Sequence, residues 1–152
     1  MKTARLVSCA VVAAVAALLL GSQVFSADDK DDQYTVIIKK VEVKKTKADG
    51  SSWDPMNGAP DLYVTVRNNT DKSGKTYSTK VKDDTFVAEF NEPTTVRFKK
   101  GEQLHFEVMD KDPVGSDEVG AINVNTGKIS EGGIRLENFG QVVVLEVSFK
   151  KL

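Results

Sequence analysis

Beyond residue 27 the apolar positions of the chain alternate with polar ones instead of recurring with a helical period. Between residues 61 and 68, for example, Leu62, Val64 and Val66 share one parity. This period of two sends successive side chains to opposite faces and is typical of β-strands. Runs of this kind predict strands at 34–45, 61–68, 75–81, 85–90, 94–98, 102–110, 119–124 and 141–149.

The segments between these runs are rich in turn-forming residues: "ADGSS", "NNTDKSGK", "NEP", "KKGE", "TGK" and "SEGG". Gly, Asn, Asp and Pro in such clusters favour tight reversals between strands. Short strands separated by turns predict an all-β fold, and specifically an antiparallel β-sandwich. We expect it to form one domain over residues 33–152.

Two strands carry more detailed expectations. In the first, Tyr34, Val36 and Ile38 share one parity while Val41 and Val43 have the other, which predicts a β-bulge between them. In the last, alternation predicts a set of core-facing side chains: Val143, Leu145, Val147 and Phe149.

The N-terminus has the pattern of an export signal. Lys2 and Arg5 precede an apolar run from Leu6 to Leu20, and small residues follow it. The run is shorter than the roughly 20 residues needed to cross a bilayer. We therefore expect a signal peptide at 1–26, an acidic tail at 27–32 and a secreted or periplasmic protein. An uncleaved membrane anchor is the alternative.

Charge and composition argue against several classes of function. The whole chain carries 21 basic and 22 acidic residues, a net charge of −1, and removal of Lys2 and Arg5 leaves 19 − 22 = −3. No basic surface for nucleic acid is indicated. His105 is the single histidine, and we expect it on a strand surface. We expect a monomer without catalytic activity; a small hydrolase with paired aspartates is the alternative.

Two acidic segments stand out, and each follows an apolar strand. They read "SSWDPMNGAPDLYV" (51–64) and "EVMDKDPVGSDEVG" (107–120). At one end of a sandwich they would bring together Asp54, Asp61, Asp110, Asp112 and Asp117. Calcium takes six to eight oxygen ligands, whereas zinc prefers His and Cys. The residues therefore predict a calcium site, with a merely solvated acidic surface as the alternative.

These two segments resemble the paired loop motifs of the C2 domain, and the likeness extends from about Tyr34 to Leu152. The resemblance implies an eight-stranded antiparallel sandwich whose loops at one end hold two or three calcium ions. Carried over by position, it implies seven metal ligands: Asp54, Asp61, Asp110, the carbonyl of Lys111, Asp112, Ser116 and Asp117.

The chain departs from the family pattern in both loops. The first is one residue longer between its aspartates, with Asp61-Leu62-Tyr63 in place of Asp-Pro-Tyr, and the second is one residue shorter. The number of calcium ions therefore stays open. The strand order, which closes with "GQVVVLEVSF", is similar to the permuted C2 topology.

The resemblance also implies a partner. In the family, bound calcium often links the loops to anionic phospholipid, and apolar residues at the loop tips enter the membrane. Met56 and Val114 occupy comparable positions, whereas we expect Trp53 to anchor the core. A calcium-stabilised protein-interaction or adhesion module, without lipid binding, is the alternative function.

Overall fold

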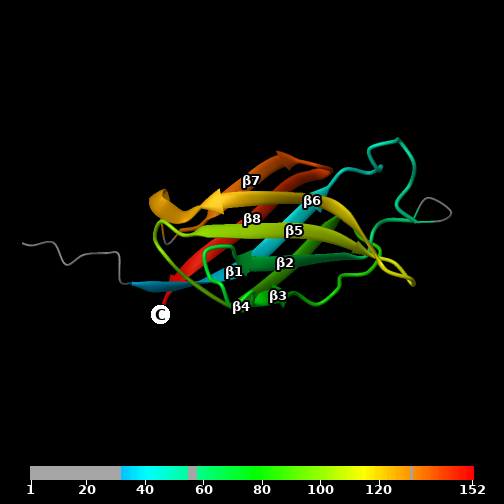
Figure 1. Ribbon diagram of the computed structural model, residues 1–152. Helices are drawn as coiled ribbons and strands as arrows, with labels where there is room; N and C mark the ends of the chain where they lie inside the picture. The colour runs from blue at the N-terminus through cyan, green and yellow to red at the C-terminus, as the bar shows by residue number, and fades with distance from the viewer. Residues whose placement is uncertain (1–31, 55–57, 131) are drawn as a thin grey trace, which may run out of the picture.

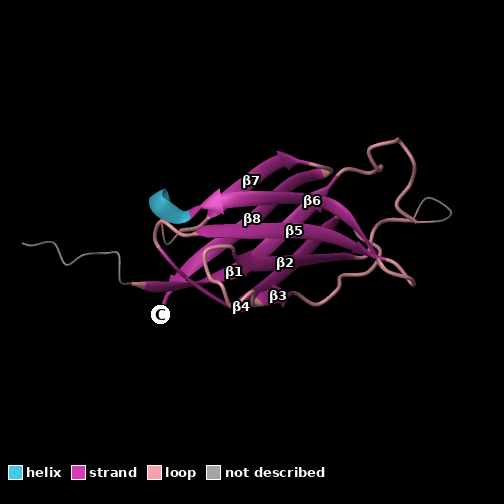
Figure 2. Ribbon diagram, in the orientation of Figure 1, coloured by secondary structure: helices cyan, strands magenta, loops and turns pink. Residues whose placement is uncertain are grey.

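The computed structural model describes residues 32–54, 58–130 and 132–152, which form two four-stranded antiparallel sheets packed face to face (Figures 1 and 2). The first sheet has, in spatial order, β4 (Val87–Lys99), β1 (Gln33–Val43), β8 (Val142–Lys151) and β7 (Ile134–Phe139). The second has β3 (Thr76–Ser78), β2 (Leu62–Asn68), β5 (Gln103–Lys111) and β6 (Ser116–Asn125). This confirms the predicted eight-stranded, all-β sandwich. The expected signal peptide and Met56 lie outside the described residues.

Helical structure is minor in this part of the chain. The 3-10 helix η2 (Thr126–Lys128) follows β6 directly. Within the described ranges, the helical segments are too short or too polar to span a membrane.

The core forms where the alternating strands of the two sheets face one another. Every second residue of β2 is buried, and β5 repeats the pattern, so that Leu62, Val64 and Phe106 are fully enclosed. The intervening residues lie on the outer face. There His105 contacts Asn123 and Glu107 through its two ring nitrogens, as expected for a strand-surface residue.

The bulge predicted in the first strand is confirmed. The register of β1 shifts between Ile38 and Lys40 in its pairing with both β4 and β8. One extra residue reverses the parity, so Val41 and Val43 are buried although they are out of phase with Ile38.

The turn predicted at "NEP" is wrong, because β4 continues through these residues and joins the predicted strands 85–90 and 94–98. Asn91 takes a left-handed φ of 49°, which asparagine tolerates, and Pro93 pairs with Ile37. Since β4 is an edge strand, a proline without an N–H is accommodated there. Backbone irregularity here bends a strand instead of ending it.

The prediction was also wrong near the C-terminus. β7, the edge strand beside β8, was not expected as a strand, because half of its residues are polar and only Phe139 is buried. In β8 the expected core residue Val143 is half-buried, while Val142 and Val144 are buried. A register shift opposite Glu42 and Val43 causes this local change of parity.

Candidate metal-binding loops

Three loops gather at one end of the sandwich: loop 1 (44–61), loop 2 (79–86) and loop 3 (112–115), at the right of Figure 1. Strand pairing places them together. Leu62 at the start of β2 pairs with Asp110 near the end of β5, and β5 returns through loop 3 into β6. The two acidic segments of the sequence therefore lie at the same end, as predicted.

Asp110 lies at the base of these loops and is fully buried, with 0% of its surface exposed. Its Oδ1 accepts a hydrogen bond of 2.8 Å from the backbone N–H of Asp61. Its Oδ2 has no hydrogen-bond partner among the described residues. Burial, and then the charges of Asp112 and Asp54, raise the pKa of Asp110. A buried, half-satisfied carboxylate is destabilising unless a cation compensates it.

Asp61 and Asp54 of loop 1 also lie near Asp110. The backbone carbonyl of Asp61 accepts from Lys111 N at 2.9 Å, which ties loop 1 to the end of β5. Burial raises the pKa of Asp54, and the neighbouring charges of Asp61, Asp112 and Asp84 raise it further. Carboxylates from all three loops thus interact electrostatically.

The remaining predicted ligands lie at the turn between β5 and β6. Asp117 faces Asp110 across the strand pair, but its side chain is 57% exposed and is bound to Lys47. The Lys111 Nζ and the Ser116 hydroxyl both donate to the carbonyl of Gly115, at 3.1 and 2.7 Å. These bonds close loop 3 on itself beside Val114.

Asp84 of loop 2 is a sixth acidic residue that sequence reasoning missed. Its Oδ1 accepts from Ala59 N at 3.0 Å, and its own N–H donates to Asp61 Oδ1 at 2.7 Å. Its φ is 46°, a left-handed value that aspartate adopts more easily than most residues. The paired aspartates of "KDDT" were the available signal. Asp84 positions loop 1 instead of joining the loop-3 carboxylates.

The donor set matches a hard cation, although the ligands do not form a closed shell. Among residues 32–54, 58–130 and 132–152, no three His, Cys, Asp or Glu side chains converge closely enough to hold a metal ion as they stand. Like charges repel, and Asp117 turns toward Lys47. The buried Oδ2 of Asp110, which has no partner in the described part of the chain, and the surrounding carboxylates nevertheless suit calcium, which accepts irregular oxygen ligation.

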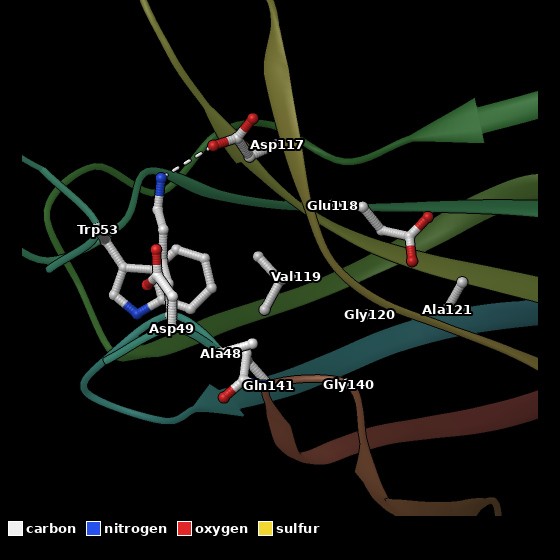
Figure 3. Close-up of a pocket in the computed structure, with 11 residues that line it drawn as sticks. Ala48, Asp49, Trp53, Asp117, Glu118, Val119, Gly120, Ala121, Gly140 and Gln141 are labelled. Atoms are coloured by element: carbon white, nitrogen blue, oxygen red, sulfur yellow. Dashed lines mark hydrogen bonds and ion pairs between the residues drawn. The ribbon is translucent and has the colours of Figure 1, made fainter. Parts of the chain in front are cut away.

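A groove of about 580 Å³ opens beside the acidic loops (Figure 3). Loop 1 forms one wall with Trp53, and the first residues of β6 form another with Asp117 and Val119. Trp53 is 5% exposed and its Nε1 donates to Lys44 O at 2.9 Å, so it anchors the loop to the core as expected.

The fold and the acidic loops at one end together indicate an antiparallel β-sandwich of the kind that carries its binding loops at one end. The family model of the C2 domain matches residues 34–139, and the chain belongs to that family. The permuted strand order stays a prediction. Comparison with curated protein sequences gives no match.

Solved structures share the fold at low sequence identity. A single C2 domain of plant extended synaptotagmin 1 aligns with a TM-score of 0.58 and 19% identity, over 80% of this chain and 95% of that one. A calcium-bound structure of two consecutive C2 domains of extended synaptotagmin 2 gives 0.55 and 17%, over 80% of this chain and 45% of that one.

Human GIVD cytosolic phospholipase A2 aligns with a TM-score of 0.62 and 20% identity over 79% of this chain. The chain spans only 17% of the phospholipase's length. The likeness is therefore one of fold, and the catalytic activity of that enzyme does not carry over.

Proposed function

We propose that this chain is an exported C2 module that binds calcium at its acidic loops and docks on anionic phospholipid. The observation that carries the proposal is Asp110, whose fully buried carboxylate has one oxygen without a partner among the described residues. Asp54, Asp61, Asp112 and Asp117 would supply further oxygens, with the carbonyl of Lys111 and the hydroxyl of Ser116. The function requires no catalysis.

Calcium would offset the negative charge of the aspartates at this end of the sandwich. The five aspartates repel one another and also repel an anionic headgroup, because like charges interact unfavourably even at several ångströms. A bound divalent ion lowers the negative potential and permits approach to the membrane. The residues of the chain hold the ion and orient the loop tips; they need no moving lid.

Val114 is the described tip residue best placed to enter a membrane. It is 94% exposed at the end of loop 3, two residues from Asp112. Burying a valine side chain contributes about 1.5 kcal/mol. We include Met56 in the membrane contact on the sequence pattern alone.

Export sets the calcium concentration that the site would meet. A signal peptide at 1–26 would deliver the domain (33–152) outside the cytoplasm, as a secreted or periplasmic monomer. Extracellular modules bind calcium with constants near 10⁻⁴–10⁻³ M, so an affinity of about this order is expected. Such a site is loaded whenever external calcium is in the millimolar range.

Two measurements test the proposal in sequence. Calorimetry of calcium binding compares the wild type with the Asp110→Asn, Asp112→Asn double variant, which keeps the size of both side chains. We expect binding in the wild type and none in the variant. Absence of heat and of any rise in melting temperature at millimolar calcium would sink the proposal.

Sedimentation with vesicles then identifies the partner. The proposal expects calcium-dependent binding to vesicles containing phosphatidylserine and little binding to phosphatidylcholine alone. Calcium binding without any vesicle binding would instead favour the protein-interaction module. Vesicle binding that persists without anionic lipid would contradict the proposed docking mode.

A further inference from the structure

Lys47 is a basic residue inside the acidic end of the molecule, and its backbone is held in a defined turn. Its N–H donates to Ser51 O at 2.9 Å, and its carbonyl accepts from Gly50 N at 3.0 Å. The Asp49 carboxylate closes the same turn by accepting from Ser51 N at 2.9 Å. Because these hydrogen bonds hold the turn, the backbone position of Lys47 is fixed.

The side chain of Lys47 runs from loop 1 to Asp117 at the start of β6. Its Nζ lies 2.9 Å from Asp117 Oδ2, the contact drawn as a dashed line in Figure 3, and 5.7 Å from the centre of the Trp53 ring. Because Trp53 is itself buried, its indole gives the ammonium a fixed wall with favourable cation–π geometry. The side chain of Lys47 is 28% exposed, so it is only partly in solvent.

The charge of Lys47 acts on several of the carboxylates. The hydrogen bond to Asp117, and then the charges of Asp117, Asp112 and Asp110, raise the pKa of Lys47. Its ammonium in turn opposes the upward pKa shifts of Asp54 and Asp110. It is a cation that these aspartates share.

An ammonium group and a calcium ion compete for the same oxygen. Lys47 offers three N–H donors and no acceptor, so it cannot join a metal's ligand set. Calcium needs six to eight oxygens, and Asp117 Oδ2 is already engaged by Lys47. The ammonium also repels any divalent cation held by Asp110 and Asp112.

We propose that Lys47 is a built-in counter-cation that reserves Asp117, so that the acidic loops take one calcium ion and a second ion must displace the ammonium. This inference rests on the proposed calcium-binding function. It assigns Lys47 the control of stoichiometry and affinity. The role of metal ligand stays with the carboxylates.

The test is a calcium titration of the purified wild-type protein and three variants, Lys47→Met, Lys47→Arg and Lys45→Met, at low ionic strength. Methionine keeps the long apolar stem that packs near Trp53 while removing the charge. Lys45 is an exposed neighbour in the same loop, so Lys45→Met controls for the change in net charge. Circular dichroism checks that each variant is folded.

We expect one calcium ion in the wild type and in Lys47→Arg, which retains the cation. In Lys47→Met we expect a second equivalent, or an affinity for the first ion that rises roughly tenfold, because a unit charge near a divalent ion acts with about this strength in water. Lys45→Met should stay within about twofold of the wild type, since the Lys45 side chain is exposed to water, where charges interact weakly.

Melting temperature gives a readout independent of binding heat. Without calcium, Lys47→Met should melt lower than Lys45→Met, because the aspartates lose their shared cation. With saturating calcium this difference should vanish or reverse. A merely structural lysine would lower the melting temperature equally in both conditions.

A double-mutant cycle with Asp117→Asn localises the effect. If Lys47 acts by reserving Asp117, Lys47→Met should raise calcium affinity much less in the Asp117→Asn background. Equal stoichiometry and affinity in Lys47→Met and Lys45→Met would overturn the inference while leaving the proposed function intact, as would two ions in the wild type. Failure of the wild type and every variant to bind calcium would overturn both.

Discussion

At the scale of single residues, the central feature is the buried carboxylate of Asp110. Asp110 is fully enclosed, its Oδ1 is bonded to Asp61 N, and its Oδ2 is without a partner among the described residues. Such a group is costly when ionised and becomes favourable only with a nearby cation. The same residue is therefore expected to oppose stability without metal and to support binding with it.

Replacing Asp110 by Asn should separate these two effects. The amide keeps an oxygen for Asp61 N but removes the buried charge. We expect the metal-free variant to be more stable than the wild type by about 1 kcal/mol and to lose calcium binding. Urea unfolding in chelator measures the first effect and calorimetry the second. A variant that is less stable in chelator would contradict this account.

The stability gain in Asp110→Asn should depend on pH in a definite direction. The folded pKa of Asp110 is raised above its ordinary value of 3.8, so its ionised form destabilises the fold. That penalty is present at neutral pH and disappears as pH falls through the raised pKa. The difference between variant and wild type should therefore shrink from about pH 7 toward pH 4. A difference that grows on acidification would exclude this cause.

Asp84 is expected to position loop 1, and substitutions at this residue test that role. Alanine at this position removes the acceptor for Ala59 N and disfavours the left-handed φ of 46°. We expect Asp84→Ala to lower stability by about 1–2 kcal/mol and Asp84→Asn to change it little, because asparagine keeps both properties. Thermal unfolding measures this. Equal losses in the two variants would point instead to the charge of Asp84.

At the scale of elements, one close contact between backbones sets the position of β6, the strand that carries Ser116 and Asp117. A Cβ added at Gly120 would lie 2.5 Å from the carbonyl oxygen of Phe139, at the end of β7. Glycine thus allows the corner between β7 and β8 to approach β6. The groove in Figure 3 is lined by this same corner, with Gly120 and Gly140 in its wall.

Gly120→Ala should consequently destabilise the fold, since the clash is with backbone and no flexible side chain can yield. We expect a loss of about 2 kcal/mol in denaturant unfolding. Gly132→Ala is the control, because a Cβ there would meet only Ser130 Oγ at 3.8 Å. A loss in Gly120→Ala no larger than in the control would show that the corner can move aside.

At the scale of the whole molecule, the candidate docking loops lie at one end of the sandwich, far from the opposite end. Loops 1, 2 and 3 lie at one end, and the C-terminal residue Leu152 lies at the other (Figure 1). Two exposed apolar side chains mark these ends, Val114 at 94% and Leu152 at 57% exposure. They provide a matched pair for testing which end meets a membrane.

Val114→Ser should weaken calcium-dependent vesicle binding by up to about tenfold, because the valine contributes about 1.5 kcal/mol when buried. Leu152→Ser should leave binding unchanged. Calcium affinity measured without lipid should be the same in both variants. Equal vesicle binding by both variants would argue against insertion of the loop-3 tip.

Most of the architecture was predictable, because alternation of apolar residues directly reports which face of a strand is buried. Leu62, Val64 and Val66 were identified in this way, and so was the bulge before Val41. The two failures have different physical causes. β7 is an edge strand in which half of the residues are polar, and in β4 the segment 91–93 continues a strand, although the same residue types elsewhere make turns.

The sequence by itself determined the sandwich and the two acidic segments, because period and residue type are local properties of the chain. Only the tertiary structure decided that Asp110 is buried with one oxygen unpaired within the described ranges, that Asp84 donates to Asp61, and that Lys47 reaches Asp117. Burial and pairing between residues as distant as 47 and 117 depend on how two sheets close, which no local pattern contains.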